Sequence, residues 1–97
     1  MKNKIENEIL TIYLEGEVNS YNAEDIENEI ESIFSKGGFK GVRLDLNDLT
    51  YISSAGLRII VRIKQQFDDT KLLNVPSGVF DILEMVGFLN LMEIQRK

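Results

Sequence analysis

The sequence contains no cysteine, no histidine and no tryptophan, and a single proline among its 97 residues. Without cysteine and histidine the chain has no thiolate nucleophile, no Ser-His-Asp triad, no imidazole acid–base group and no zinc site with Cys or His ligands. Carboxylates, lysines and hydroxyls remain, and no spaced pair of carboxylates stands out at the end of an expected strand. These residue types predict a protein that is not an enzyme, with no catalytic residues, no metal and no cofactor.

Long apolar runs are also missing. No run approaches the ~18 residues of a membrane span, and the opening residues MKNKI are not followed by the apolar core of a secretory signal. Acidic residues outnumber basic ones by 16 to 11, and the resulting net charge of -5 disfavours nucleic acid and anionic membranes as partners. We therefore expect a monomeric cytoplasmic protein with no direct nucleic-acid or membrane partner.

The composition that remains is that of an ordinary folded domain. The apolar fraction of 43% and the charged fraction of 28% lie near the averages for soluble globular proteins. A chain of 97 residues has room for one core, and we find no internal repeat, linker or low-complexity segment. Residues 1–97 are expected to form a single domain.

Alternation of apolar and polar residues predicts the strands. The clearest strand spans residues 10–15 and is closed by Gly16. A second clear strand spans residues 42–46 and ends in a polar turn at residues 47–50. Three further strands are shorter or less regular, and they are expected at residues 3–6, at residues 71–75 and around Met92 and Ile94.

Apolar residues at helical spacing predict three helices, at residues 23–34, 54–67 and 77–86. Asn22 suits the N-cap of the first helix, and Gly37 stops it. Either Ser53 or Ser54 can cap the second. The acidic run on the first helix is interpreted as a solvated face in preference to a partner-binding patch.

The order of these elements sets the fold class. Strands and helices alternate along the chain, which implies right-handed crossovers between parallel strands. The alternating strands have one apolar side, so the helices should gather against that side. We therefore predict an α/β fold with a mixed, mainly parallel sheet of four to five strands and helices largely on one face.

The stretch after the second clear strand carries the most specific pattern. Residues 46–58 read LNDLTYISSAGLR. This stretch resembles the signature of STAS domains, particularly the bacterial anti-sigma factor antagonists, in which a strand leads through a serine-containing turn into a helix. Further likenesses lie at residues 14–19 (LEGEVN), at Ala23, at Pro76 and at Gly87-Phe88. The resemblance covers nearly the whole chain and implies the STAS fold.

The resemblance also implies a switch. In that family the serine in the position of Ser54 is phosphorylated by a partner, an anti-sigma factor with serine kinase activity, and a metal-dependent serine phosphatase reverses the modification. The unphosphorylated form binds the anti-sigma factor and so frees a sigma factor. The resemblance therefore implies phosphorylation at Ser54, with Ser53 as the runner-up.

Two positions depart from the family pattern. Asn19 and Ser53 stand where the family often has acidic residues. The resemblance therefore implies that the electrostatic field around Ser54 is less negative than in family members that have those acids. Some family members lack a working phosphosite. The alternative is therefore a constitutive STAS subunit of a larger signalling or lipid-transport assembly, in which Ser54 is only structural.

Partner binding is expected at one edge of the sheet, because loops after parallel strands and helix starts gather there. The predicted partner-binding residues are Asn19, Ser20, Tyr21, Ser53, Ser54, Gly56, Arg58 and Arg62. Simpler interpretations stay open, namely that Ser54 is only an N-cap and that Arg58 and Arg62 form a solvated stripe. Tyr21 and Tyr51 are expected to pack in the core or at its rim.

Overall fold

The computed structural model describes residues 1–97, and all five of its strands belong to one sheet. In chain order the strands are β1 (Asn3–Glu6), β2 (Ile9–Val18), β3 (Gly41–Ile52), β4 (Thr70–Val75) and β5 (Glu93–Arg96). They lie in the same order across the sheet. β1 is antiparallel to β2, and every other neighbouring pair is parallel. The predicted mixed, mainly parallel sheet is confirmed.

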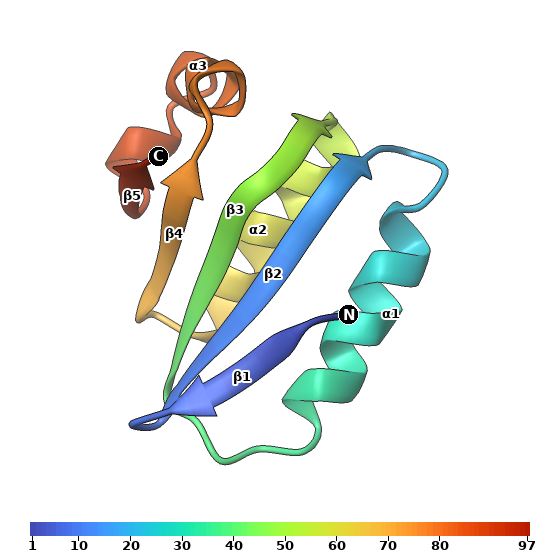
Figure 1. Ribbon diagram of the computed structural model, residues 1–97, viewed down its shortest axis with the longest axis vertical. Coiled ribbons are helices and arrows are strands. Elements are labelled where there is room, and N and C mark those ends of the chain that lie inside the picture. The colour runs from blue at the N-terminus through green and yellow to red at the C-terminus, as the bar shows by residue number, and fades with distance from the viewer.

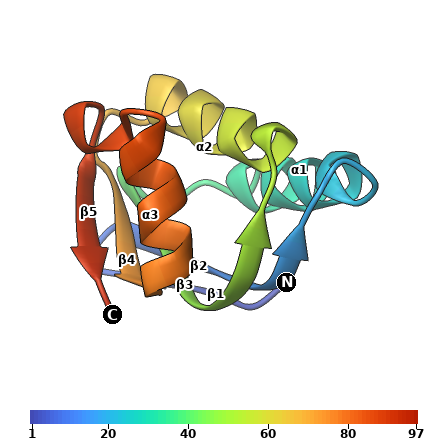
Figure 2. The same cartoon turned by 90° about the horizontal axis from the view of Figure 1, so that it is seen from above.

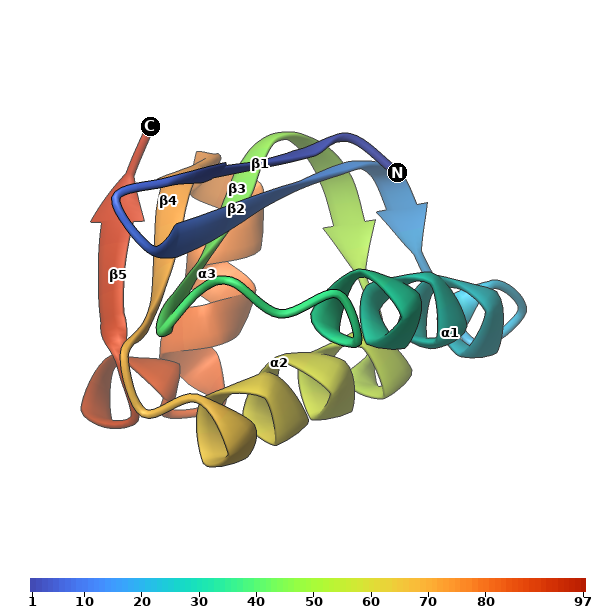
Figure 3. The same ribbon diagram turned by 90° about the horizontal axis from the view of Figure 1, so that it is seen from below.

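Two of the three helices cover one face of this sheet. The helices are α1 (Ala23–Phe34), α2 (Ser54–Gln66) and α3 (Ser77–Met85), followed by the 3-10 turn η1 (Phe88–Asn90). α1 and α2 lie next to each other on one side of the strands, as Figures 2 and 3 show. α3 is seen end-on beyond the end of β4 (Figure 1). None of these helices is long and apolar enough to cross a membrane.

The core lies between α1, α2 and the apolar side of the sheet. Alternation along the strands turns one set of side chains toward the helices, and the sheet residues with 0% exposure are Leu10, Ile12, Val42, Leu44, Leu46 and Leu72. Ile30 of α1 and Ile60 of α2 close over them, each with 1% exposure. Full burial of one such leucine or isoleucine contributes about 1.5–3 kcal/mol, so this packing holds α1 and α2 against the sheet.

Both long strands continue past the ends predicted for them. Gly16, expected to close β2, has a φ of +72° inside the strand, and the expected turn at residues 47–50 belongs to β3. The register of the two strands shifts at this level, between Tyr13 and Glu15 and between Gly16 and Glu17. Such bulges accommodate glycine and polar residues without ending the pairing. As a result β2 and β3 end together.

The less regular elements also form. β1 turns into β2 through Asn7 and Glu8, which have φ values of 53° and 66°, and β4 and β5 pair in parallel at the other side of the sheet. Gly87 has a φ of 82°, which ends the helical conformation after α3. Phe88 then packs back into the core with 5% exposure. Met92 is buried just before β5 and lies outside the strand.

Candidate phosphorylation site and docking surface

The ends of β2 and β3 bring two loop segments together at one edge of the sheet. Val18 and Ile52, the last residues of these strands, are register partners, and the Ser53 N–H donates to the Val18 carbonyl at 2.8 Å. β2 then leads into the loop before α1, while β3 leads directly into α2 (Figure 1). The structure therefore places the residue 19–22 loop beside the start of α2.

The two serines at the start of α2 have different environments. Ser53 is the N-cap, and its half-buried hydroxyl oxygen accepts from the Gly56 N–H at 3.4 Å. Ser54 is the first helical residue; its side chain is exposed and forms no hydrogen bond. The capping role that the sequence left open between them therefore belongs to Ser53. The hydroxyl of Ser54 is free.

Gly56 sets how closely α2 approaches the sheet. A Cβ atom at this position would lie 2.6 Å from Cγ1 of Ile52 and 2.8 Å from Cγ1 of Val18. Both distances are far below van der Waals contact, so only glycine fits without a shift of its neighbours. Gly56 is buried. Of the predicted partner-binding residues it is therefore one that positions α2 and is not itself exposed to a partner.

Asn19 and Asn22 hold the loop before α1 in one conformation. The Asn19 side-chain oxygen accepts from the backbone N–H groups of Tyr21, at 2.9 Å, and Asn22, at 3.1 Å. The Asn22 side chain accepts from the Asn19 N–H and donates to the Glu17 carbonyl, both at 2.8 Å. Asn22 occupies the predicted N-cap position of α1, but its side chain makes no capping bond because its amide is already used within the loop.

Tyr21 projects from this loop into solvent. Its exposed fraction is 95%, so the expectation that it packs in the core or at the rim is wrong. The loop bonds fix the backbone while no neighbouring element covers the ring. Tyr51 is 45% exposed and is not among the residues packed against the core, so it too is more exposed than expected. Ser20 is exposed beside Tyr21.

A shallow groove of about 310 Å³ runs between the starts of α1 and α2. Its lining residues are Ser20, Ala23, Glu24 and Glu27 on one side and Ala55, Arg58, Ile59 and Arg62 on the other. Across it, Nη1 of Arg62 donates to both carboxylate oxygens of Glu27, at 2.8 and 2.9 Å. Glu27 is therefore paired, although the acidic run was expected to be a solvated face. Arg62 is likewise paired and does not belong to a purely solvated stripe. Arg58 is exposed and has no such partner.

Four exposed members of the predicted set lie at this groove or next to one of its lining residues. Ser20 and Arg58 line it, Tyr21 follows Ser20 in the loop, and Ser54 precedes the lining residue Ala55. We call Ser20, Tyr21, Ser54 and Arg58 the docking surface. Asn19 supports it from within the loop, and Ser53 and Gly56 support it from the start of α2. Sequence reasoning missed Glu27, because an ion pair between two helices leaves no periodic signal in either of them.

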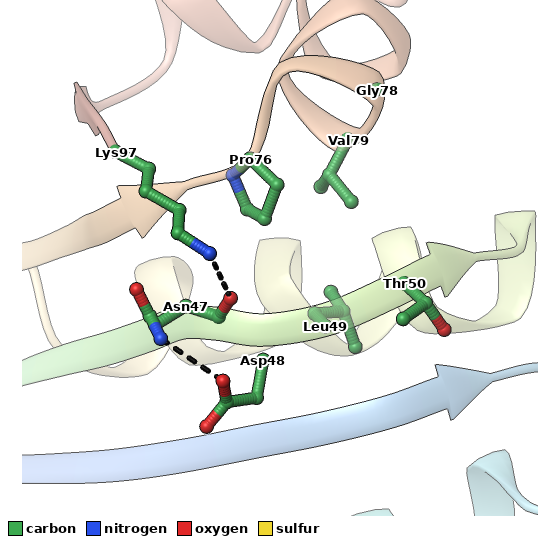
Figure 4. A pocket seen from close by; sticks show the side chains of 8 residues that line it. All are labelled: Asn47, Asp48, Leu49, Thr50, Pro76, Gly78, Val79 and Lys97. Atoms are coloured by element: carbon green, nitrogen blue, oxygen red, sulfur yellow. Dashed lines mark hydrogen bonds between the residues drawn. The ribbon is translucent and has the colours of Figure 1, made fainter.

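The largest cavity lies elsewhere. It measures about 460 Å³ and is bounded by β3 residues 47–50, the start of α3 and Lys97 (Figure 4). Nζ of Lys97 donates to the Asn47 carbonyl at 3.1 Å, and the Asn47 amide donates to a carboxylate oxygen of Asp48 at 3.0 Å. None of the predicted partner-binding residues lines it, so this cavity and the docking surface are separate places.

Comparison with known proteins places the chain beside one family. The family model of the STAS domain matches residues 1–97. The chain is 37% identical over 90 residues to BtrV of Bordetella bronchiseptica, a protein named as a candidate anti-sigma factor antagonist. That match covers 89% of this chain and 77% of BtrV.

Solved structures give the same fold. A Thermotoga maritima protein described as a candidate anti-sigma factor antagonist superposes with a TM-score of 0.87 at 22% identity, covering 99% of this chain and 86% of that one. The anti-sigma factor antagonist SpoIIAA in its unphosphorylated form superposes with a TM-score of 0.77 at 19% identity, covering 96% and 85%. SpoIIAA of Bacillus in its phosphorylated form gives 0.69 at 18% identity, covering 96% and 88%. At these identities the likeness shows the fold alone.

Proposed function

The chain belongs to the STAS domain family, and we propose that it is an anti-sigma factor antagonist switched by phosphorylation at Ser54. In the unphosphorylated form it binds an anti-sigma factor with serine kinase activity and so releases a sigma factor. A metal-dependent serine phosphatase regenerates that form. The relative BtrV, named as a candidate antagonist and 37% identical, supports the antagonist role, and the existence of SpoIIAA in a phosphorylated form supports the switch.

One observation carries the choice of residue: the Ser54 hydroxyl is exposed and unbonded, whereas the Ser53 hydroxyl is half-buried and accepts a hydrogen bond. A kinase needs an accessible hydroxyl whose oxygen attacks the γ-phosphorus of ATP. The bond from that phosphorus to the β–γ bridging oxygen then breaks, ADP leaves, and a base of the kinase takes the hydroxyl proton. Ser54 meets this requirement without disturbing the cap of α2.

The position also explains how one modification can leave the fold intact and still prevent binding. At the first residue of a 13-residue helix, the free backbone N–H groups and the helix dipole favour a negative charge. The phosphate adds about -1.5 to -2 units of charge on the docking surface of a chain that already carries -5. A partner surface shaped for a hydroxyl has to desolvate that charge, at a cost of several kcal/mol if it remains unpaired.

Tyr21 supports a protein partner at this surface. Its ring is 95% exposed, and four hydrogen bonds within the loop fix the backbone that carries it. A large side chain on a rigid support loses little conformational entropy on binding, and tyrosine is enriched among the residues that dominate binding energy. Tyr21 thus has the properties of an interface anchor on the docking surface.

The test is phosphorylation by the cognate kinase-like anti-sigma factor and ATP, with the modified residue located by mass spectrometry. We expect phosphate at Ser54 in the wild type and in Ser53→Ala, and none in Ser54→Ala. Ser53→Ala is the matched control, because it removes the neighbouring hydroxyl and loses only the cap, typically about 1 kcal/mol of stability. Phosphate on another residue, or none with a kinase that is active on its own substrate, would contradict the proposal.

The constitutive STAS subunit remains the second candidate, because Asn19 and Ser53 replace residues that the family often has as acids. Copurification separates the two. A switched antagonist brings down a kinase-like anti-sigma factor, and ATP releases that partner as Ser54 becomes phosphorylated. A constitutive subunit brings down a larger assembly whose composition ATP does not change.

A further inference from the structure

Arg58 is the one arginine of the chain that has no partner in the structure. The other three are paired as follows: Arg43 with Asp69, Arg62 with Glu27, and Arg96 with the ring of Phe80. Arg58 is exposed on the docking surface, and its guanidinium forms neither a hydrogen bond nor an ion pair. A guanidinium presents five donors in a fixed fork that matches carboxylate and phosphate groups, so this group is available to an anion.

We propose that Arg58 binds the phosphate once Ser54 is phosphorylated, an inference that rests on the proposed modification of that serine. Both residues lie in α2, four positions apart, so they share one face with Cβ atoms about 5–6 Å apart. The anion is on the N-terminal side and the cation on the C-terminal side, which is the more favourable orientation for a helical ion pair. The length of the arginine side chain spans the remaining gap to the phosphate oxygens.

The charges around Arg58 favour this pairing. Three other charged groups line the groove: Glu24 and Glu27 from α1 and Arg62 from α2. Glu27 is already bound to Arg62 at 2.8 Å, which leaves Glu24 as the competing anion. The phosphate carries up to two negative charges and three acceptor oxygens against one charge on Glu24. The first turn of α2 contains no acidic residue that would repel it.

The pairing changes the docking surface in two ways at once. In the unmodified protein Arg58 offers a free cation to an acidic group of the partner. In the phosphorylated protein the same guanidinium is occupied within the chain, while the phosphate stands where the Ser54 hydroxyl was. Phosphorylation therefore adds an anion and withdraws a cation from the same surface.

The experiment uses the full chain with phosphoserine inserted at position 54 by genetic code expansion, so that it needs no cognate kinase. The second pKa of the phosphate, about 6 in an unperturbed phosphoserine, is followed by ³¹P NMR across a pH titration. A bound guanidinium stabilises the dianion, so we expect the pKa in the wild type to lie about 0.2–0.7 unit below that in Arg58→Gln. Arg58→Lys should recover part of the difference.

The double variant Glu27→Gln/Arg62→Gln is the matched control, because it removes an ion pair from the same groove without freeing a carboxylate to compete for Arg58. It should leave the phosphate pKa close to that of the wild type. Equal pKa values in the wild type and Arg58→Gln would overturn the inference, as would an equal rise in Arg58→Gln and the double variant. A kinase that ignores Ser54 would contradict the proposed function separately, because this titration does not use the kinase.

Discussion

Two helices of this protein begin with an exposed serine, and only one of them has the surroundings of a switch. Ser54 opens α2 and Ser77 opens α3, and neither hydroxyl forms a hydrogen bond. Four residues later α2 has the unpaired Arg58, whereas α3 has Asp81, an exposed carboxylate. A phosphate on Ser77 would therefore face a like charge one turn away. An exposed serine at a helix start is common chemistry; its neighbours decide what it can do.

The glycines after these serines make the same distinction. A Cβ atom at Gly56 would collide with Ile52 and Val18, whereas a Cβ atom at Gly78 would meet nothing within 4 Å. The start of α2 is thus pressed onto the ends of two central strands at Gly56, whereas the start of α3 turns Gly78 to solvent and packs through Val79, which is 2% exposed. The close fit at a glycine belongs to the start of α2.

The largest predicted effect is on the stability of the fold, when a side chain is added at Gly56, where α2 lies against the ends of β2 and β3. Gly56→Val places a β-branched side chain against Ile52, and overpacking of this kind typically costs about 1–3 kcal/mol. Gly78→Val, the matched variant at α3, should stay within about 0.5 kcal/mol of the wild type. Urea unfolding of both variants measures the difference. Equal stabilities would mean that the close approach at Gly56 is incidental.

The next effect concerns binding. Phosphorylation of Ser54 should weaken the complex with the kinase-like anti-sigma factor by about 1–3 kcal/mol, or 5- to 150-fold. Ser54→Asp should weaken it less, because one carboxylate imitates a phosphate imperfectly, and Ser54→Ala should bind like the unmodified protein. Ser77→Asp adds the same charge at the start of α3 and should leave the affinity unchanged. Calorimetric titration distinguishes these variants. Equal weakening by Ser54→Asp and Ser77→Asp would mean that any added negative charge weakens binding, wherever it lies on the protein.

Local patterns were sufficient to predict the order of strands and helices and the three helix starts. The period-2 alternation in β2 and β3 and the helical spacing in α1 and α2 reflect burial on one side of each element, so they survive in the sequence alone. The serine-rich start of α2 could be located for the same reason. The close approach of Gly56 to Val18 and Ile52 appears only in the structure.

The errors arose where a neighbouring element decides the outcome. Gly16 and residues 47–50 have the composition of turns, yet pairing between β2 and β3 continues through them as bulges. Asn22 occupies the N-cap position predicted for it, yet its side chain bonds to Asn19 and Glu17 and not to the helix. Tyr21 lies in a loop and belongs to no periodic element, so no pattern in the sequence indicated whether its ring is covered. For the two strands the missing information was a pairing distant along the chain, and for Asn22 and Tyr21 it was the conformation of the loop at residues 19–22.

The smallest effect we predict concerns Tyr21, and it tests whether an exposed side chain on the docking surface differs from an exposed side chain elsewhere. Tyr21→Ala should leave the stability unchanged, because a ring that is 95% exposed buries almost no surface on folding. It should weaken binding of the anti-sigma factor by at least about 1 kcal/mol, the usual threshold for a residue that matters in an interface. Met85→Ala is the matched control, because this side chain near the end of α3 is 84% exposed and lies outside the docking surface. Its removal should change neither stability nor affinity. If both variants weaken the complex equally, exposed apolar area anywhere on the protein contributes to binding, and Tyr21 is no anchor.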